Sequence, residues 1–314
     1  MRTPLVSVII PNYNHAPYLV QRFETVLFQT YRNFEIIVLD DCSTDNSRGI
    51  IEQYRAHKQV VQVVYNDANS GSTFRQWLKG IELSKGEYVW IAESDDWCEP
   101  SFLETVLSGM LQQEDCVIGY CQSYCIEEPD KIRWQSKYPR LTDYLEGRAF
   151  IEKNMLTNTA IFNASMAVWK KEQFSLVSRE FTRYRFCGDW LFWIELCMHG
   201  GVFISGKALN YFRRHGGDVS NLSYSGGEGL VEEFALFTLL RNRKWISDRH
   251  FLLSIKILYI RFKDAERLLL PSKRKQIRGL FFQEPPVKRF LQRFYRRFYI
   301  MHAIRKVVDA AIPA

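Results

Sequence analysis

The sequence lacks any long apolar run, and it contains no low-complexity tract and no internal repeat. The longest apolar stretch, residues 251–260, is interrupted by Lys256 and is far shorter than the roughly 20 residues that a membrane-spanning helix needs. Near the start, residues 6–10 are too few for the core of a signal peptide, and no small-residue cleavage site follows them. These absences predict a cytoplasmic protein that does not span a membrane.

Paired cysteine motifs are also missing. The seven cysteines are an odd number, and none of them forms a C-x-x-C pair with another. We therefore expect reduced thiols that pack as small apolar groups. A zinc site at Cys116, Cys121 and Cys125 is the alternative, but no clustered histidine completes a tetrahedral set.

Excess positive charge is confined to the C-terminal tail. The 314 residues carry a formal net charge of +7, yet residues 273–306 alone contain eleven Lys and Arg against one acid, Glu284. The rest of the chain is slightly acidic, so we expect no nucleic-acid partner. Within residues 286–311, apolar residues recur at helical spacing opposite arginines, a pattern typical of a basic amphipathic helix on an anionic membrane surface. A helix packed on its own domain is the alternative.

Short apolar segments alternate with segments of helical spacing in the first third of the chain. Strands are predicted at residues 6–10, 34–39, 60–65 and 88–92, and helices at about 18–29, 47–57, 77–84 and 101–112. This alternation predicts an α/β fold with a mostly parallel central sheet flanked by helices. Residues 116–210 are less regular, with one strand expected at 203–211, and a C-terminal helical extension follows at 228–242, 249–269 and 286–311.

Polar clusters follow three of the four predicted strands. The clusters are Asn12-Tyr13-Asn14, Asp40-Asp41 and Glu93-Ser94-Asp95-Asp96. Ligands of open parallel sheets gather beyond the carboxyl ends of the strands. We therefore expect the three clusters to meet at one edge of the sheet.

The acidic cluster after the fourth strand suits a divalent cation. Three carboxylates within four residues repel one another, which costs stability unless a cation is present. Mg²⁺ prefers hard oxygen ligands and often binds one or two carboxylates together with substrate phosphates. A solvated acidic turn that begins the next helix is the alternative. For the polar clusters after the first two strands, the alternative is likewise an ordinary structural role in a turn.

These segments in combination resemble a known family. The nucleotide-binding half of family 2 glycosyltransferases with the GT-A fold is similar, in order and spacing, to residues 4–14 (PLVSVIIPNYN), 34–47 (FEIIVLDDCSTDNS), 69–75 (NSGSTFR) and 85–97 (KGEYVWIAESDDW). The similarity resumes at residues 187–190 (CGDW) and 211–220 (YFRRHGGDVS). It implies a GT-A domain at residues 1–220, with a nucleotide-binding half at about 1–115 and an acceptor half at about 116–220. The resemblance does not cover residues 221–314, a helical region with the basic amphipathic tail.

The resemblance implies binding roles for the matching positions. Tyr13 and Asp41 are similar to the pair that holds the nucleotide base, with Asp41 facing a uracil or thymine N–H. Arg75 is similar to a basic residue near the base or diphosphate, although the family more often carries Ala-Arg-Asn where Phe-Arg-Gln stands here. The other implied donor contacts are Pro11, Asn14 and Asp95.

The resemblance also implies a bound Mg²⁺ or Mn²⁺ ion. Asp95 and Asp96 match the metal and ribose carboxylates of the family, and Glu93, where the family usually carries Asp, is expected either to reach the ion or to shape the loop. His215 is a further expected ligand, because an imidazole can bind a metal ion. For His215, a position in a solvated surface loop is the alternative. The other five histidines show no partner pattern and are given structural roles.

Asp189 is the expected general base. An acceptor hydroxyl is a poor nucleophile, so a positioned base must take its proton as the new bond forms. The family carries its catalytic carboxylate at the position that Asp189 matches, and the apolar neighbours of Asp189 are expected to raise its pKa. An N-cap of the following helix is the structural alternative, and the two roles are compatible.

The implied activity is that of an inverting glycosyltransferase. It would move a sugar from a nucleoside diphosphate sugar, with UDP or dTDP favoured, to a hydroxyl of a glycan or lipid-linked glycan acceptor. The implied location is the cytoplasm, peripheral to the inner face of the cell membrane. Two rivals remain: a non-catalytic sugar-nucleotide-binding or scaffold subunit of a polysaccharide assembly complex, and a nucleotidyltransferase. The second would carry a Gly-rich phosphate loop after the first strand, which residues 11–14 (PNYN) do not resemble.

Overall fold

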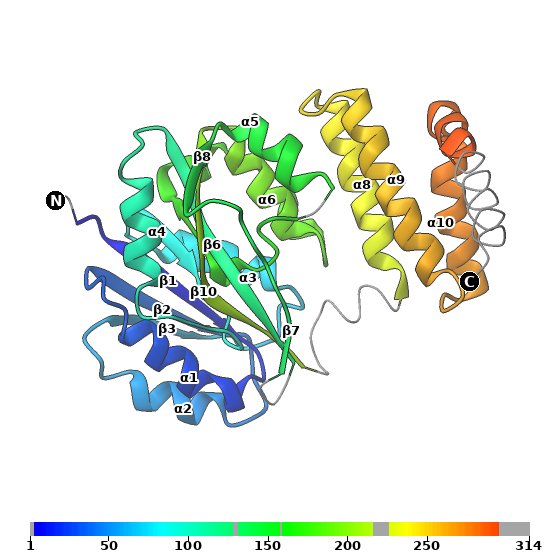
Figure 1. The fold of residues 1–314 in the computed structure, drawn as a ribbon. Coiled ribbons are helices and arrows are strands. Elements are labelled where there is room, and N and C mark those ends of the chain that lie inside the picture. Colours follow the sequence, from blue (N-terminus) through cyan, green and yellow to red (C-terminus); the bar gives the residue numbers. More distant parts are fainter. Residues whose placement is uncertain (1–2, 128–130, 158, 216–225, 295–314) are drawn as a thin grey trace, which may run out of the picture. The chain divides into compact units, whose positions relative to one another are not determined.

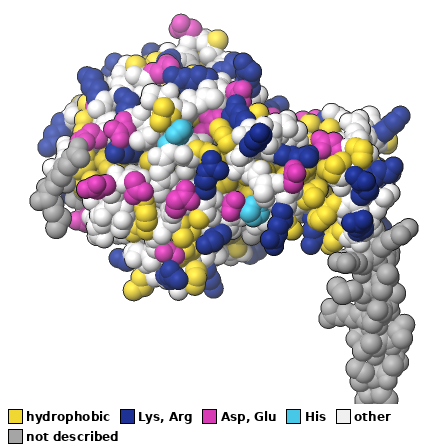
Figure 2. Space-filling view, turned by 90° about the horizontal axis from the view of Figure 1, so that it is seen from above, with side chains coloured by type: hydrophobic (Ala, Val, Ile, Leu, Met, Phe, Trp, Pro, Cys, Tyr) yellow, Lys and Arg dark blue, Asp and Glu magenta, His cyan; other side chains and the backbone are white. Residues whose placement is uncertain are grey.

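The computed structural model describes residues 3–127, 131–157, 159–215 and 226–294. The chain divides into two compact units, residues 1–218 and 219–314. The N-terminal unit is built on a ten-stranded sheet, and the C-terminal unit is helical where it is described (Figure 1). On the face seen in Figure 2, Lys and Arg side chains are interspersed with Asp and Glu over the larger, N-terminal unit.

The four strands predicted in the first third form one parallel block. Their order is β3-β2-β1-β4, with β1 at Val6–Asn12, β2 at Phe34–Asp40, β3 at Val60–Tyr65 and β4 at Tyr88–Ile91. Val6 pairs with Phe34 in β2 and with Tyr88 in β4, so these strands end at the same edge. β1, β2 and β4 are buried along their whole length, which explains why their apolar runs are continuous.

Helices cover both faces of this block. α1 (Ala16–Leu27) and α2 (Ser47–Tyr54) follow β1 and β2, whereas α3 (Thr73–Leu83) returns the chain across the sheet to β4. Because such crossovers are right-handed, α1 and α2 lie on one face and α3 on the other (Figure 1). Gly80 lets α3 approach closely, since a Cβ there would lie 2.4 Å from a methyl carbon of Ile9.

The second half of the unit is more regular than the sequence predicts. β6 (Cys116–Glu127) and β10 (Gly201–Arg214) are long parallel strands, and β9 (Ala167–Lys170) lies antiparallel between β4 and β6. The remaining elements are β5 (Trp97–Cys98), β7 (Lys131–Gln135), β8 (Thr142–Leu145), α4 (Phe102–Met110), α5 (Gly147–Phe150) and α6 (Gly188–Cys197). Since β9 opposes both of its neighbours, β10 runs in the direction of β1 to β4 and ends at their edge.

The prediction of an irregular region was wrong for β6 because polar residues interrupt its apolar pattern. Ser123 and Gln122 are buried in this strand, and their side chains bond to β10. The Asn210 amide donates to Ser123 Oγ at 2.8 Å, and the Gln122 amide donates to the carbonyl of Ser205 at 3.1 Å. The periodicity of apolar residues cannot predict hydrogen bonds between strands that lie so far apart in the sequence. The seven cysteines, all in the described part of the chain, are thiols rather than disulfides, and six are buried.

The C-terminal unit contains α8 (Glu228–Asn242), α9 (Asp248–Ala265) and α10 (Pro271–Gln283). α8 and α9 match the predicted helices closely, whereas α10 was not predicted. A further helix begins at residue 285 and is described to 294, so most of the helix predicted at 286–311 lies outside the described residues. No helix in the described ranges is long and apolar enough to cross a membrane.

Candidate active site

The edge where β1, β4 and β10 end brings together three potential metal ligands. His215 follows β10 directly, and its Nε2 lies 3.1 Å from Asp95 Oδ2, after β4. His15, between β1 and α1, places its Nδ1 2.8 Å from Ser94 Oγ and its ring centroid 5.4 Å from that of His215. One donor atom from each of His15, Asp95 and His215 lies within 4.8 Å of the others. Residues from three distant parts of the sequence thus form one compact group.

Burial and charge set the protonation of this group. Burial lowers the pKa of His15, although the charge of Asp95 opposes the effect. For Asp95, burial acts to raise the pKa, but the hydrogen bond with His215 and the charges of both histidines hold it below its ordinary value. Neutral imidazoles and ionised carboxylates are the forms that bind metal ions.

Asp96 lies deeper and is held by protein donors. It is 1 % exposed, and Oδ2 accepts hydrogen bonds from Asn163 Nδ2 and Ser165 Oγ, each at 2.7 Å. Its Oδ1 accepts the backbone N–H of Arg213 at 3.1 Å, which joins β10 to the acidic segment, residues 93–96. Burial, reinforced by the charge of Asp95, raises the pKa of Asp96 to about 6. Both carboxylate oxygens of Asp96 therefore accept hydrogen bonds from the protein.

Glu93 contacts α3. The indole N–H of Trp77, in α3, donates a hydrogen bond of 2.8 Å to the Glu93 carboxylate. Trp77 also packs against Phe192 and Trp193 of α6, with ring centroids 5.9 and 6.2 Å away. Burial, and then the charge of Asp95, raise the pKa of Glu93 to about 8. Neither Glu93 nor Asp96 belongs to the group formed by His15, Asp95 and His215.

In metal-free protein, the free energy of unfolding is expected to fall as pH rises through the range set by Glu93. Its pKa is 4.5 in the unfolded chain and about 8 in the folded protein, so over this range the unfolded state loses its proton first. Glu93→Gln should flatten the profile above about pH 7, where most of Asp96, with its pKa of about 6, has lost its proton. Urea midpoints across this range, measured with a chelator present, test the prediction, and equal slopes for the two proteins would contradict it.

A buried arginine supports the acidic segment from α1. Arg22 is 0 % exposed, and its Nε donates to the backbone carbonyl of Glu93 at 2.8 Å. Its Nη2 lies 3.2 Å from Ser165 Oγ and 4.0 Å from Asp96 Oδ2. The guanidinium also lies over the ring of Trp90, 5.7 Å from its centroid. Arg22 therefore places a positive charge beneath a segment that carries three acids.

Arg22→Met is expected to lower the free energy of unfolding by about 3–5 kcal/mol, because Asp96 then stays buried without a nearby cation. Arg55→Met is the matched control, since Arg55 pairs with Glu52 at 2.8 Å on the surface and should matter little. Urea denaturation of both variants measures the difference. Two equally small losses would show that Arg22 does not stabilise the segment.

Arg213 fixes the path of the chain into His215. Its guanidinium contacts the rings of Tyr18 and Trp97, 4.6 and 4.4 Å from their centroids. Its Nε donates to the backbone carbonyl of Asp95 at 2.8 Å, and the residue is 8 % exposed. Arg213 thus fastens the end of β10 to the acidic segment, and this attachment positions His215 beside Asp95.

The residues after β1 are joined to the loop after β2. Pro11 lies within β1, opposite Leu39 of β2. Asn14 adopts a left-handed backbone conformation with φ of 56°, and its Oδ1 accepts the backbone N–H of Thr44 at 2.7 Å. Tyr13, between them, is 46 % exposed. The structure therefore presents an accessible aromatic side chain on a well-anchored turn.

Asp41 directly follows β2 and organises the segment before α3. It is 4 % exposed, and its Oδ1 accepts hydrogen bonds from Asn66 Nδ2 at 2.6 Å, the Ser70 N–H at 2.9 Å and Gln76 Nε2 at 2.9 Å. Arg75 is exposed in the first turn of α3 and donates to the carbonyl of Ser70 at 3.2 Å. The Asp41 carboxylate is thus engaged by protein donors.

Asp189 is the second residue of α6. Its carboxylate accepts the backbone N–H of the next residue at 2.8 Å, and Cys187 occupies the N-cap position. Asp189 therefore lies in the first turn, where a negative charge is favoured, and is not the N-cap. A Cβ at Gly188 would lie 2.4 Å from the carbonyl oxygen of Phe181 and 2.5 Å from the ring of Phe74, so glycine lets α6 begin against α3.

Sequence reasoning missed three contributors to this region. His15 was given a structural role, and neither Arg22 nor Trp77 was identified. The position of His15, directly after the polar cluster that ends β1, is a signal that favours a place at the same edge. Arg22 and Trp77 lie within helices, and nothing in their spacing distinguishes them from ordinary surface or core residues.

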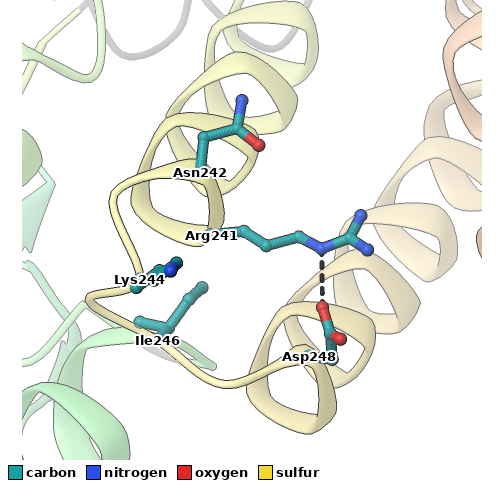
Figure 3. Close-up of a pocket in the computed structure, with 5 residues that line it drawn as sticks. All are labelled: Arg241, Asn242, Lys244, Ile246 and Asp248. Atoms are coloured by element: carbon teal, nitrogen blue, oxygen red, sulfur yellow. Dashed lines mark hydrogen bonds and ion pairs between the residues drawn. The ribbon is translucent and has the colours of Figure 1, made fainter.

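A pocket of about 530 Å³ lies in the C-terminal unit, at the turn between α8 and α9. Its lining residues are Arg241, Asn242, Lys244, Ile246 and Asp248 (Figure 3). Arg241 donates to Asp248 at 2.7 Å and to Glu284 at 2.9 Å. The pocket contains none of the predicted site residues.

Comparisons with known proteins agree with this architecture. A model of glycosyl transferase family 2 matches residues 7–174, more than half of the chain. The glycosyltransferase GlyG of Streptococcus pneumoniae serotype 4 is 30 % identical over 287 residues, covering 84 % of this chain and 89 % of GlyG.

Solved structures of low sequence identity share the fold. TarS of S. aureus, in complex with UDP-GlcNAc, has a TM-score of 0.63 at 16 % identity and covers 93 % of this chain and 91 % of its own. A mannosyltransferase from Pyrobaculum calidifontis, in complex with GDP-Man and Mn²⁺, has a TM-score of 0.54 at 13 % identity and covers 98 % and 88 %. The predicted fold is confirmed, and the chain belongs to the family 2 glycosyltransferases with the GT-A fold.

Proposed function

We propose that this glycosyltransferase moves a sugar from a UDP- or dTDP-sugar to a hydroxyl of a glycan or lipid-linked glycan, with inversion at the anomeric carbon. The observation that carries the proposal is the meeting of Asp95 and His215 at the edge where the parallel strands end. The helix of Asp189 is attached to the same segment by Trp77, which bonds to Glu93 and packs on α6. The UDP-GlcNAc complex of TarS supports a UDP-sugar donor.

The residues at this edge fit a divalent ion. Asp95 Oδ2 and His215 Nε2 lie 3.1 Å apart, a separation that suits neighbouring ligands of one ion, and one carboxylate oxygen with one imidazole nitrogen suits Mn²⁺. We propose that Asp95 and His215 hold Mg²⁺ or Mn²⁺, which would neutralise charge on the departing diphosphate. Asp96 and Glu93 then act by positioning the segment that carries Asp95.

Donor binding is proposed for the turns after β1 and β2. The exposed ring of Tyr13 is available to stack on the base, with Pro11 and Asn14 fixing its turn. Asp41 accepts a base N–H in this proposal, and its present partners on residues 66–76 would adjust as the donor enters. Arg75, which now donates to the carbonyl of Ser70, is proposed to contact the base or diphosphate.

Asp189 is proposed to take the proton of the acceptor hydroxyl. As that hydroxyl attacks the anomeric carbon, the bond to the diphosphate breaks on the opposite face, and the single displacement inverts the configuration. A carboxylate at the start of α6, attached to the acidic segment through Trp77, suits this role because the base must lie beside the donor sugar.

A panel of nucleotide sugars, assayed with and without Mn²⁺, tests the function. We expect metal-dependent thermal stabilisation by UDP- or dTDP-sugars, and slow hydrolysis of the matching donor without acceptor. Stabilisation without hydrolysis or transfer would favour the alternative, a non-catalytic sugar-nucleotide-binding subunit. No stabilisation by any nucleotide sugar would contradict the proposal as a whole.

We also propose that residues 295–314, which lie outside the described residues, bind anionic membrane surfaces. For residues 286–294 the structure favours the packed alternative, since Val287 and Leu291 are 0 and 1 % exposed. Residues 295–314 contain four Lys and Arg, and each could contribute about 1 kcal/mol at an anionic surface. Truncation after Phe294 is therefore expected to reduce sedimentation with phosphatidylserine vesicles and to preserve donor hydrolysis. Unchanged sedimentation would remove the membrane proposal.

A further inference from the structure

His15 is held firmly at the edge where β1 ends. The left-handed backbone of Asn14 turns the chain out of β1, and His15 occupies the N-cap position of α1 without making a side-chain cap hydrogen bond. The backbone N–H of Ala16 donates to Asp45 Oδ2 at 2.9 Å, which fastens the start of the helix to the loop after β2. The backbone thus fixes the base of the His15 side chain, and helix capping does not employ its ring.

The ring of His15 is oriented by the acidic segment itself. Its Nδ1 lies 2.8 Å from the hydroxyl of Ser94, a residue that is 1 % exposed and directly precedes Asp95. Metal-bound histidines commonly use one ring nitrogen for the ion and the other for such an orienting hydrogen bond. The contact with Ser94 engages Nδ1, and the ring of His15 lies edge-on to that of His215, with their centroids 5.4 Å apart.

The three donor atoms are close enough to share one ion. Donors of His15, Asp95 and His215 lie within 4.8 Å of one another. Two atoms that bind one ion at about 2.1 Å are at most about 4.2 Å apart, so a small rotation of one side chain closes the difference. The three residues follow the ends of β1, β4 and β10.

We propose that His15 is a direct ligand of the divalent ion, which makes the protein set two imidazole nitrogens and one carboxylate oxygen. This inference rests on the metal site of the proposed function. It goes beyond that site by assigning a third protein ligand and a preference for one metal ion over another. Imidazole suits transition metal ions, whereas Mg²⁺ favours oxygen ligands. A set with two imidazoles therefore selects Mn²⁺ over Mg²⁺.

Electron paramagnetic resonance of Mn²⁺ bound to the full chain, in the presence of UDP, tests the inference without an activity assay. Pulsed measurements are expected to detect two imidazole nitrogens in the wild type, one in His15→Ala and one in His215→Ala. Titration should show that His15→Ala binds Mn²⁺ at least about tenfold more weakly, with a smaller loss in Mg²⁺ affinity. His15→Gln, which keeps a polar group for Ser94, should show the same loss of one nitrogen.

His57→Ala is the matched control, because His57 is exposed in the turn after α2 and stacks on Tyr54 at 5.7 Å. It should keep two nitrogen couplings and the wild-type affinity. Two couplings in both His15 variants, or unchanged Mn²⁺ affinity, would overturn the inference and leave the proposed function standing. Absence of Mn²⁺ binding by the wild type with UDP would instead overturn the proposed metal site, and the role of His15 with it.

Discussion

Asp189→Asn is expected to lower the rate of sugar transfer by about two to four orders of magnitude, because the amide cannot take the proton of the acceptor hydroxyl. Donor binding should stay near the wild-type level. The amide oxygen retains an acceptor for the backbone N–H that the carboxylate now binds at 2.8 Å, so the start of α6 is preserved. Single-turnover transfer, combined with calorimetric titration of the donor, separates the two effects.

Asp115→Asn provides the matched control for Asp189. Asp115 is an exposed acid that directly precedes β6, at the opposite edge of the sheet, and it accepts a hydrogen bond from Tyr144. Its replacement should leave transfer unchanged. Wild-type turnover by Asp189→Asn would refute the assignment of the base. A parallel loss of donor binding and folding stability would show that Asp189 serves the helix instead.

The second large effect is expected for Asp95→Asn. Loss of this charge should reduce metal-dependent transfer by about a hundredfold or more, because charge on the departing diphosphate is then poorly stabilised. Binding of Mn²⁺ in the presence of UDP should weaken in the same variant. The fold should be retained, since the backbone carbonyl of Asp95, rather than its side chain, receives the hydrogen bond from Arg213.

Asp96→Asn separates positioning from metal binding. The Asp96 carboxylate accepts hydrogen bonds from Asn163, Ser165 and the backbone of Arg213, so an amide at this position leaves a buried donor unpaired. The free energy of unfolding should fall by about 1–3 kcal/mol, with a smaller change in Mn²⁺ affinity than Asp95→Asn produces. A stable Asp95→Asn variant with full turnover would contradict the role of Asp95. Equal losses of metal affinity in both variants would place Asp96 among the ligands.

The sequence predicted the half of the molecule in which local pattern and tertiary environment agree. β1, β2 and β4 are buried on both faces, so their residues form unbroken apolar runs that end at polar clusters. Because parallel strands end at one edge, the meeting of the residues after β1, β2 and β4 follows from chain order alone. β6 was missed because its polar residues are satisfied only by β10, far away in the sequence.

The side chains that complete the site were less predictable for a similar reason. Arg22 resembles any helical surface arginine until the acidic segment is placed over it, where it contacts the Glu93 carbonyl. Because Asp95 and Asp96 are neighbours in the sequence, the sequence alone does not show which of the two is more deeply buried. Their relative depth depends on Asn163 and Ser165, which reach Asp96 from a segment about 70 residues later. Hydrogen-bond partners distant in the chain thus decide between the roles that the sequence pattern leaves open for a side chain.

A crystal structure of the full chain with UDP and Mn²⁺ examines the central claim most directly. It should place the diphosphate at the edge where β1, β4 and β10 end, with the ion against Asp95 and His215, the base beside Tyr13 and the Asp189 carboxylate facing the vacant sugar position. Nucleotide bound on another surface, or a diphosphate and ion remote from Asp95, would contradict the account.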